Sequence, residues 1–268
     1  VQDFGRDLFD ALVAGEVRSR FDVSQQIAET QGKGLRIKLR FQTAQLAALP
    51  WEFLYDSRRG EYLCLSVHTP LVRYLELPQP PQPLTITSPL KILGMIVSPT
   101  DINPLDTARE KLRVDESLKP LLARGAAQIT WLQGHTWRDL QKAMRSDDFH
   151  IFHFIGHGDF NAPTDEGRLA LADENNRASF VTATQLSRLL ADYRTLRLVV
   201  LNSCEGGKGG VQDIFSSTAS ILVRRGLPAV LAMQYEITDK AAIEFARAFY
   251  ESLAEGFAVD ASVSEARK

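Results

Sequence analysis

Two short apolar runs, each ending abruptly in small and reactive residues, constrain the fold of this chain most. The run at 149–155 (FHIFHFI) leads to His157, and the run at 196–201 (LRLVVL) leads to Cys204. Continuous hydrophobicity over this length is typical of strands that are buried on both faces, as in a parallel sheet. Because the carboxyl ends of parallel strands meet at one edge of a sheet, we expect the imidazole and the thiol at the same edge.

Strand and helix patterns alternate on both sides of these two runs. The expected strands lie at 90–97, 127–132, 149–155, 196–201 and 228–233, with a short one at 168–171 inside a polar insertion. The expected helices lie at 108–123, 137–145, 182–190, 215–225 and 239–255. Such alternation predicts an α/β fold with a mostly parallel central sheet and helices on both faces.

A segment with four prolines in six residues, 78–83 (PQPPQP), separates this pattern from the first third of the chain. Proline neither continues a helix nor donates to a β-ladder, so the segment is expected to be an extended linker. Before it, we expect helices at 3–14 and 42–49 and strands at 35–41, 62–67 and 71–77. We therefore predict an N-terminal subdomain with its linker at 1–83 and a main domain at 84–268.

Composition narrows the class of protein. The chain has 268 residues, 44% of them hydrophobic and 24% charged, which is ordinary for a globular protein. Its net charge of −2 indicates no nucleic-acid partner. No apolar stretch approaches the ~18 residues that span a bilayer, and no signal peptide is recognisable, so we expect a cytoplasmic protein without a membrane partner. The chain runs from Val1 to Lys268, and we expect it to be a piece of a longer protein that also holds a regulator.

The distance between the two reactive residues points to a family. Cys204 follows His157 by 47 residues, close to the separation of about 50 residues in caspases. Together with the stretches at 50–56 (PWEFLYD), 69–73 (TPLVR) and 233–242 (MQYEITDKAA), the H-G and N-S-C-E-G-G motifs resemble caspase-type cysteine peptidases, and most closely the CHAT family. The resemblance spans nearly the whole chain.

This resemblance implies a cysteine endopeptidase that cleaves a protein substrate, in a bacterial signalling or defence pathway. Cys204 would be the nucleophile, His157 would transfer protons, and the backbone N–H groups of Gly158 and Cys204 would stabilise the oxyanion. It also implies a caspase-like fold whose N-terminal subdomain is a degenerate, pseudo-caspase-like copy. A TPR or sensor module is the expected regulator, and no cofactor is implied.

Residues for substrate binding are likewise suggested by the resemblance. Asn202 stands where several related peptidases carry an acidic residue that selects a basic side chain, so strong selectivity for arginine or lysine is not expected here. Met233, Gln234 and Tyr235 would lie beside an extended substrate. Asp159 either orients the histidine and meets the substrate, or simply begins a turn.

Several cysteine, histidine and glycine residues allow interpretations other than catalysis. Cys64, flanked by leucines in an expected strand, fits a small buried hydrophobic residue. His153 and His157 would lie ~13 Å apart on a strand, too far to share a metal ion, and His153 fits a buried structural role. The stretch 205–210 (EGGKGG) lacks the serine or threonine that follows the lysine of a phosphate-binding P-loop.

Two functions compete with proteolysis. One is a catalytically silent caspase-fold module used for interaction or signalling. The other is a different thiol enzyme, such as an acyltransferase or ligase. The presence of both His157 and Cys204 favours an enzyme over a silent module.

Overall fold

Contacts divide the chain into two units, which are described separately below. The computed structural model describes residues 1–41, 43–47, 49–75, 77, 88–164, 166–202, 214–232 and 239–268. The first unit comprises Val1–Glu76 together with Glu244–Lys268, and the second comprises Leu77–Ile243. Residues 244–268 make their contacts within the first unit, which differs from the main domain predicted for them. The predicted boundary at residue 83 falls outside the described residues and stays a prediction.

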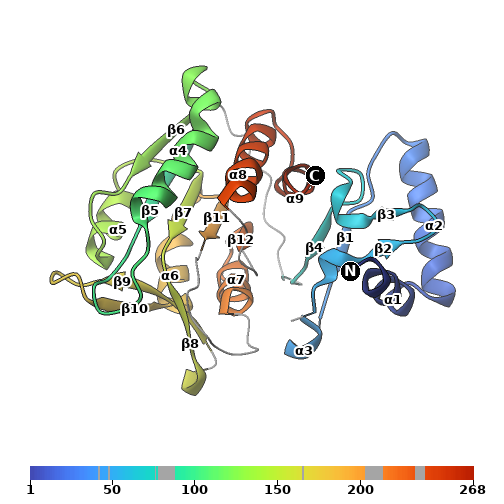
Figure 1. Cartoon of the computed structure of the whole chain (residues 1–268), viewed down its shortest axis with the longest axis horizontal. Coiled ribbons are helices and arrows are strands. Elements are labelled where there is room, and N and C mark those ends of the chain that lie inside the picture. Colours follow the sequence, from blue (N-terminus) through green and yellow to red (C-terminus); the bar gives the residue numbers. More distant parts are fainter. Residues whose placement is uncertain are drawn as a thin grey trace. The chain divides into compact units, whose positions relative to one another are not determined.

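A parallel sheet forms the centre of the second unit (Figure 1). Among the described residues, five strands follow one another in the order β12-β11-β7-β5-β6, and every neighbouring pair is parallel. The strands are β5 (Leu90–Ile96), β6 (Ala127–Trp131), β7 (Ile151–Ile155), β11 (Leu198–Asn202) and β12 (Ala229–Ala232). The predicted α/β fold with a parallel central sheet is confirmed, and all five strands lie where the apolar runs predicted them.

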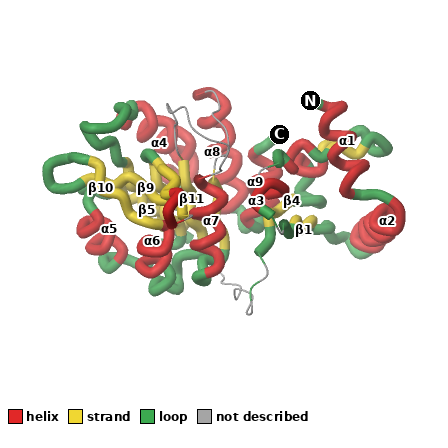
Figure 2. Tube along the Cα trace, turned by 90° about the horizontal axis from the view of Figure 1, so that it is seen from below, coloured by secondary structure: helices red, strands yellow, loops and turns green. Residues whose placement is uncertain are grey.

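Helices cover both faces of this sheet, as Figure 2 shows for α4 on one side and α5 and α6 on the other. The bounds of these three helices are Thr107–Ala123 for α4, Trp137–Met144 for α5 and Ala183–Leu190 for α6. A fourth helix of this unit is α7 (Ile214–Arg224). Alternate strand residues such as Leu93, Phe152 and Val199 form one hydrophobic cluster with Leu140 of α5 and Leu186 of α6. Burial on both faces explains why the inner strands β5, β7 and β11 show continuous rather than alternating hydrophobicity.

On the face of the sheet that packs against α4, a tryptophan makes the close contacts. A Cβ atom on Gly94 of β5 would lie 2.4 Å from the ring of Trp131, its neighbour on β6. The indole Nε1 of Trp131 donates to the carboxylate of Asp115 on α4 across 2.8 Å. Glycine is therefore required at position 94 because the indole occupies the space of a side chain.

Helix boundaries follow the capping signals of the sequence. Thr136 caps α5 by accepting from the Asp139 N–H at 3.1 Å, and the Asp139 carboxylate accepts from the Thr136 N–H in return. Thr182 and Gln185 form the same reciprocal arrangement at the start of α6. Helix α7 ends before Gly226, whose φ of 105° is the left-handed conformation that favours glycine.

A small antiparallel sheet follows the histidine-bearing strand. Its strands are β8 (Gly158–Asn161), β9 (Glu166–Ala172) and β10 (Ala178–Thr182), in the order β10-β9-β8. The sequence analysis predicted only a strand at 168–171. It missed the other two because they are short and lack alternating hydrophobicity, and their stability comes from pairing with β9.

The first unit is built around helices and short strands. Its elements are α1 (Gln2–Leu12), α2 (Gly15–Thr30), β1 (Ile37–Leu39), α3 (Ala44–Ala47), η1 (Trp51–Phe53), β2 (Tyr55–Asp56), β3 (Glu61–Tyr62), η2 (Leu63–Leu65) and β4 (Leu71–Arg73). The C-terminal part of the chain contributes α9 (Val259–Ala266), and α8 (Asp239–Ala254) crosses the division between the units. Strands β1 and β4 are parallel, and a cluster that includes Phe9, Trp51 and Leu54 forms the core.

The predicted strand at 62–67 is wrong beyond Tyr62. The chain instead turns at Leu63–Leu65, where the Leu63 N–H donates to the Leu54 carbonyl at 3.0 Å. Leu54 and Leu63 lie in different segments, so the pattern of apolar residues around either of them does not predict this contact. Cys64 is buried as expected, and its thiol donates to the carbonyl of Glu52 at 3.0 Å. Burial raises the pKa of the Cys64 thiol, which suits a structural residue.

None of the helices in the described ranges is long and apolar enough to cross a membrane.

Candidate active site

The carboxyl ends of β7 and β11 are held side by side by the register of the sheet. Ile155, the last residue of β7, pairs with Asn202, the last residue of β11. Just beyond this pair, the N–H of Gly156 donates to the carbonyl of Asn202 across 3.3 Å. His157 follows Ile155 by two residues, and Cys204 follows Asn202 by two, although Cys204 itself lies outside the described residues.

Gly156 allows the chain to turn tightly between Ile155 and His157. A Cβ atom at this position would lie 2.5 Å from the ring of Phe154 and 3.2 Å from the carbonyl oxygen of Val97. The protein's own atoms therefore occupy the space of a side chain here, so Gly156 serves the packing of the strand end.

His157 occupies the bend between β7 and β8. Its carbonyl accepts a hydrogen bond from the Ala170 N–H at 2.9 Å, which fixes its backbone to β9. The Nε2 atom of its ring is buried and makes no hydrogen bond to any residue in the described part of the chain. Buried imidazole nitrogens normally have a partner, so this atom is available to a group supplied from elsewhere.

The pairing of β8 with β9 leaves the Gly158 N–H directed away from β9. Gly158 is opposite Leu169, and in the adjacent pair the Ala170 N–H donates to the His157 carbonyl, which marks that pair as the hydrogen-bonded one. Residue pairs in an antiparallel ladder alternate between hydrogen-bonded and non-hydrogen-bonded positions. Gly158 therefore occupies a non-hydrogen-bonded position, and its N–H is not used by β9.

Asp159 is engaged with the small sheet. Its carboxylate accepts from the Arg168 guanidinium, with the Arg168 Nε atom 3.1 Å from Oδ2, and its Oδ1 accepts from the Phe160 N–H at 2.7 Å. The same guanidinium lies over the ring of Phe180, 4.1 Å from the ring centroid. Arg168 and Phe180 were not singled out from the sequence, because only the pairing of β8, β9 and β10 brings them beside Asp159.

The remaining predicted substrate residues have different outcomes. Asn202 is half-buried at the end of β11, beside the bend that carries His157. Met233, Gln234 and Tyr235 lie outside the described residues, so their predicted contact with substrate stays a prediction.

His153 lies within β7 and is 3% exposed. Burial lowers the pKa of its imidazole from 6.5 to about 4, so the ring is neutral at neutral pH. This agrees with a structural residue. Within the described ranges, His, Cys, Asp and Glu form no group of three or more that could hold a metal ion.

The segment that follows β5 is anchored to the turn between β9 and β10. The carbonyl of Asn176 accepts from the Thr100 N–H at 2.9 Å, and the Asp101 carboxylate accepts from the Ala178 N–H at 2.7 Å. The Ala178 hydrogen bond is the main cause of a lowered pKa for the Asp101 carboxyl group. These contacts tie the carboxyl end of β5, next to β7, to the small sheet that continues from His157.

Comparisons with known proteins bear on the family. The structure of a pilus assembly-related protein from Burkholderia pseudomallei K96243 shares 18% identity with this chain, covers 68% of it and 96% of itself, and superposes with a TM-score of 0.30. At that TM-score the likeness says nothing about fold or function. No curated protein matches the chain in sequence. A family model described as the CHAT domain matches residues 2–268. The chain therefore belongs to the CHAT domain family of caspase-like cysteine peptidases.

Proposed function

We propose that this chain is a cysteine endopeptidase that uses Cys204 and His157 to cleave a protein substrate. The observation that carries the proposal is the pairing of Ile155 with Asn202 at the ends of β7 and β11. Since each reactive residue follows its member of this pair by two residues, the register supports a thiol and an imidazole at one edge of the sheet. Membership of the CHAT family supports the same chemistry.

The proposed reaction begins when His157 takes the proton of the Cys204 thiol. The thiolate attacks the scissile carbonyl carbon, a C–S bond forms, and the carbonyl electron pair moves onto oxygen. The N–H groups of Gly158 and Cys204 would donate to this oxyanion, which agrees with a Gly158 N–H that β9 does not use. The tetrahedral intermediate collapses, the C–N bond breaks, and His157 returns the proton to the leaving amine.

Hydrolysis of the thioester completes the proposed cycle. His157 takes a proton from water, and the hydroxide attacks the acyl carbon. The C–S bond breaks, the new carboxylic acid leaves, and His157 returns its proton to the thiolate, which restores the thiol. The buried Nε2 of His157, which has no partner among the described residues, is suited to exchange these protons.

The test uses purified protein and a mixture of peptides produced from a whole proteome. New N-termini that appear with the parent protein, and are absent with Cys204→Ala, would support endopeptidase activity and identify its cleavage sites. If a thiol-directed peptide probe labels Cys204 but added amines are acylated instead of water, the protein is a transferase or ligase. If neither cleavage nor labelling occurs under any condition, the silent interaction module is favoured.

We further propose that the activity is cytosolic and controlled by a regulatory module or partner, such as a TPR or sensor domain. The segment Glu205–Asp213 carries four glycines in nine residues directly after the nucleophile. Ordering each residue of such a segment costs about 1–2 kcal/mol in backbone entropy, so a partner that stabilises one conformation can raise activity strongly. Equal specific activity of this chain alone and of the full-length protein with its activator would contradict such control.

A further inference from the structure

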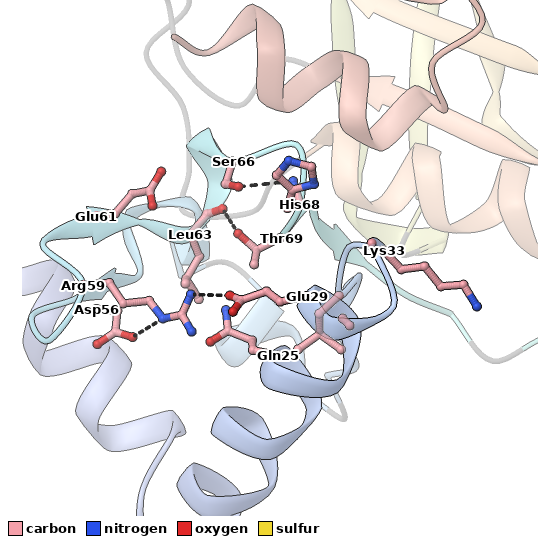
Figure 3. Close-up of a pocket in the computed structure, with 13 residues that line it drawn as sticks. Gln25, Glu29, Lys33, Asp56, Arg59, Glu61, Leu63, Ser66, His68 and Thr69 are labelled. Atoms are coloured by element: carbon pink, nitrogen blue, oxygen red, sulfur yellow. Dashed lines mark hydrogen bonds and ion pairs between the residues drawn. The ribbon is translucent and has the colours of Figure 1, made fainter.

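Charged groups around a cavity of about 420 Å³ in the first unit are paired with one another (Figure 3). Arg59 donates to Glu29 at 3.2 Å and lies 4.0 Å from Asp56. Arg18 of α2 also donates to Asp56, at 3.3 Å. These two carboxylates therefore have partners within the protein, in contrast to several backbone groups beside His157 in the second unit.

The small sheet that begins directly after His157 has two edge strands. Strand β8 forms one edge and β10 the other, with β9 between them (Figure 1). Each edge strand bonds to β9 through alternate residues, so the intervening residues direct their N–H and C=O groups away from β9. These outward-facing residues are Gly158 and Phe160 on β8, and Ala178, Phe180 and Thr182 on β10.

Side chains close the edge at β10. The Ala178 N–H donates to the carboxylate of Asp101 at 2.7 Å, and the Thr182 N–H donates to the side-chain oxygen of Gln185 at 3.0 Å. The outward N–H groups at both ends of this strand are therefore already used. An edge that is protected in this way does not readily add a further strand.

The edge at β8 is open. Within the described ranges, no residue forms a hydrogen bond with the Gly158 N–H or with the outward carbonyls of Gly158 and Phe160. The Phe160 N–H is used, because it donates to Oδ1 of Asp159 at 2.7 Å. Gly158 and Phe160 are half-buried, and backbone polar groups that are withdrawn from water need partners. This edge is therefore suited to receive an extended peptide.

The open edge begins at the proposed catalytic centre. Gly158 directly follows His157, and its N–H is the proposed donor to the oxyanion. A substrate whose scissile carbonyl accepts from this N–H already meets the first residue of the edge. Because a strand rises about 3.3 Å per residue, the carbonyl of Phe160 lies roughly 7 Å further along, within reach of the same extended substrate.

We propose that the substrate binds as an additional β-strand along the free edge of β8. The inference rests on the proposed peptidase function and deepens it, because strand addition requires an extended segment of the substrate protein. Since Asp159 occupies the Phe160 N–H, the edge beyond the Gly158 N–H offers only carbonyl acceptors. The substrate must therefore supply backbone N–H groups at two alternate residues. If P1 is the residue whose carbonyl is attacked, these are P1 and P3 in an antiparallel strand, or P2′ and P4′ in a parallel one.

Phe160→Pro tests the edge in the full 268-residue chain. A proline ring at an outward-facing nitrogen obstructs a further strand and leaves the bonds to β9 in place. Phe160→Ala is the matched control, because it also lacks the aromatic ring but keeps the edge unobstructed. On a peptide that the parent cleaves and that extends from P4 to P4′, kcat/KM of Phe160→Pro should be about tenfold or more below that of Phe160→Ala.

A short substrate shows whether the proline acts only at the edge. An acetylated P1 residue joined to aminomethylcoumarin reaches Gly158 but has no residue that could meet Phe160. The two variants should hydrolyse it at similar rates and give matched circular dichroism spectra. An equal loss on the long and the short substrate would trace the effect to displacement of His157 and would overturn the inference.

N-methylated peptides identify the substrate residue that pairs with Phe160. Methylation of its N–H should lower kcat/KM by about tenfold for Phe160→Ala and have little effect for Phe160→Pro, in which that bond is already lost. Sensitivity at P3 indicates an antiparallel strand, and sensitivity at P4′ indicates a parallel one.

The failure of strand addition is distinguishable from the failure of the peptidase function. If the parent cleaves the peptide but neither P3 nor P4′ is sensitive, or both variants respond equally, the substrate does not pair with β8 and the peptidase function stands. If the parent cleaves no peptide, the proposed function is contradicted, and this inference with it.

Discussion

The carbonyl of Asn202 accepts a hydrogen bond from the N–H of Gly156 across 3.3 Å. This bond extends the pairing of β7 with β11 by one step beyond Ile155 and Asn202, the last residues of the two strands. It fixes the backbone immediately before His157 to the backbone two residues before Cys204. The bend that carries the imidazole is thereby tied to the end of β11 by main-chain geometry.

The first prediction concerns the two proposed catalytic residues. Cys204→Ala and His157→Ala should each abolish peptide cleavage, because one removes the nucleophile and the other removes the group that transfers its proton. Cleavage assays with matched circular dichroism spectra check this. Cys64→Ala is the control, since that thiol is buried and donates to the Glu52 carbonyl, and it should leave cleavage nearly unchanged. Full turnover by either catalytic variant would exclude the proposed dyad.

The second prediction concerns the space at Gly156. Gly156→Ala would place a Cβ atom 2.5 Å from the ring of Phe154, so the strand end must shift and carry His157 with it. We expect a loss of roughly 1–3 kcal/mol in the free energy of unfolding and a large loss of activity in the folded protein.

Gly94→Ala provides the comparison for that variant. Its Cβ atom would lie 2.4 Å from the ring of Trp131, away from the histidine. Denaturant titration should show a similar loss of stability, while activity per folded molecule stays near that of the parent. Equal loss of activity in both variants would show that Gly156 has no special role in positioning His157.

The third prediction is a pH dependence of stability caused by His153. Burial lowers the pKa of this imidazole from 6.5 to about 4 in the folded protein. Between these values the unfolded chain binds the proton and the folded chain does not. The contribution of this group to the free energy of unfolding should therefore be fully present above about pH 7. It should decrease by on the order of 3 kcal/mol as the pH is lowered through 6.5 towards 4.

Urea titrations of the parent and of His153→Leu between pH 7 and pH 4 measure this contribution. The variant should lose less stability across the interval. A residual slope is expected, because burial also lowers the pKa of His150, which remains in the variant. Parallel curves for the two proteins would mean that His153 is not the group responsible.

The fourth prediction separates two roles for Asp159, whose carboxylate binds Arg168 in the structure. If the carboxylate acts only by joining β8 to β9, then Asp159→Asn and Arg168→Gln should reduce activity equally, and the double variant should be no worse than either. If it also meets the substrate, Asp159→Asn alone should raise KM. Steady-state kinetics of the three variants decide between these roles. The ion pair is partly exposed, so each substitution should change stability by only about 0–1 kcal/mol.

The fifth prediction concerns the reactivity of the thiol. A free cysteine has a pKa near 8.5, and a neighbouring histidine usually lowers it. Alkylation of Cys204 with a small neutral reagent, followed against pH, should therefore show an acidic limb in the parent. His157→Ala should shift that limb towards 8.5. An unperturbed profile in the parent would show that His157 is not the partner of the thiol.

Much of the fold could be predicted from the sequence because its causes are local. Apolar runs of strand length indicated the five strands of the central sheet, and the alternation with helices predicted that they are parallel. The capping bonds between Thr136 and Asp139 are likewise local, because they join residues only three apart. The motifs around His157 and Cys204 indicated the family, and the match of residues 2–268 to the CHAT domain agrees.

Other features depend on contacts between distant segments, and only the tertiary structure decided them. The register that pairs Ile155 with Asn202, and the sheet that brings Arg168 to Asp159, arise from strand pairing that no local pattern specifies. The ion pair between Arg18 of α2 and the buried carboxylate of Asp56 on β2 joins residues that are 38 positions apart. The sequence by itself therefore determined the elements of the central sheet and indicated the residues that are proposed to react. Tertiary packing decided what each residue contacts, because those contacts join groups that are far apart along the chain.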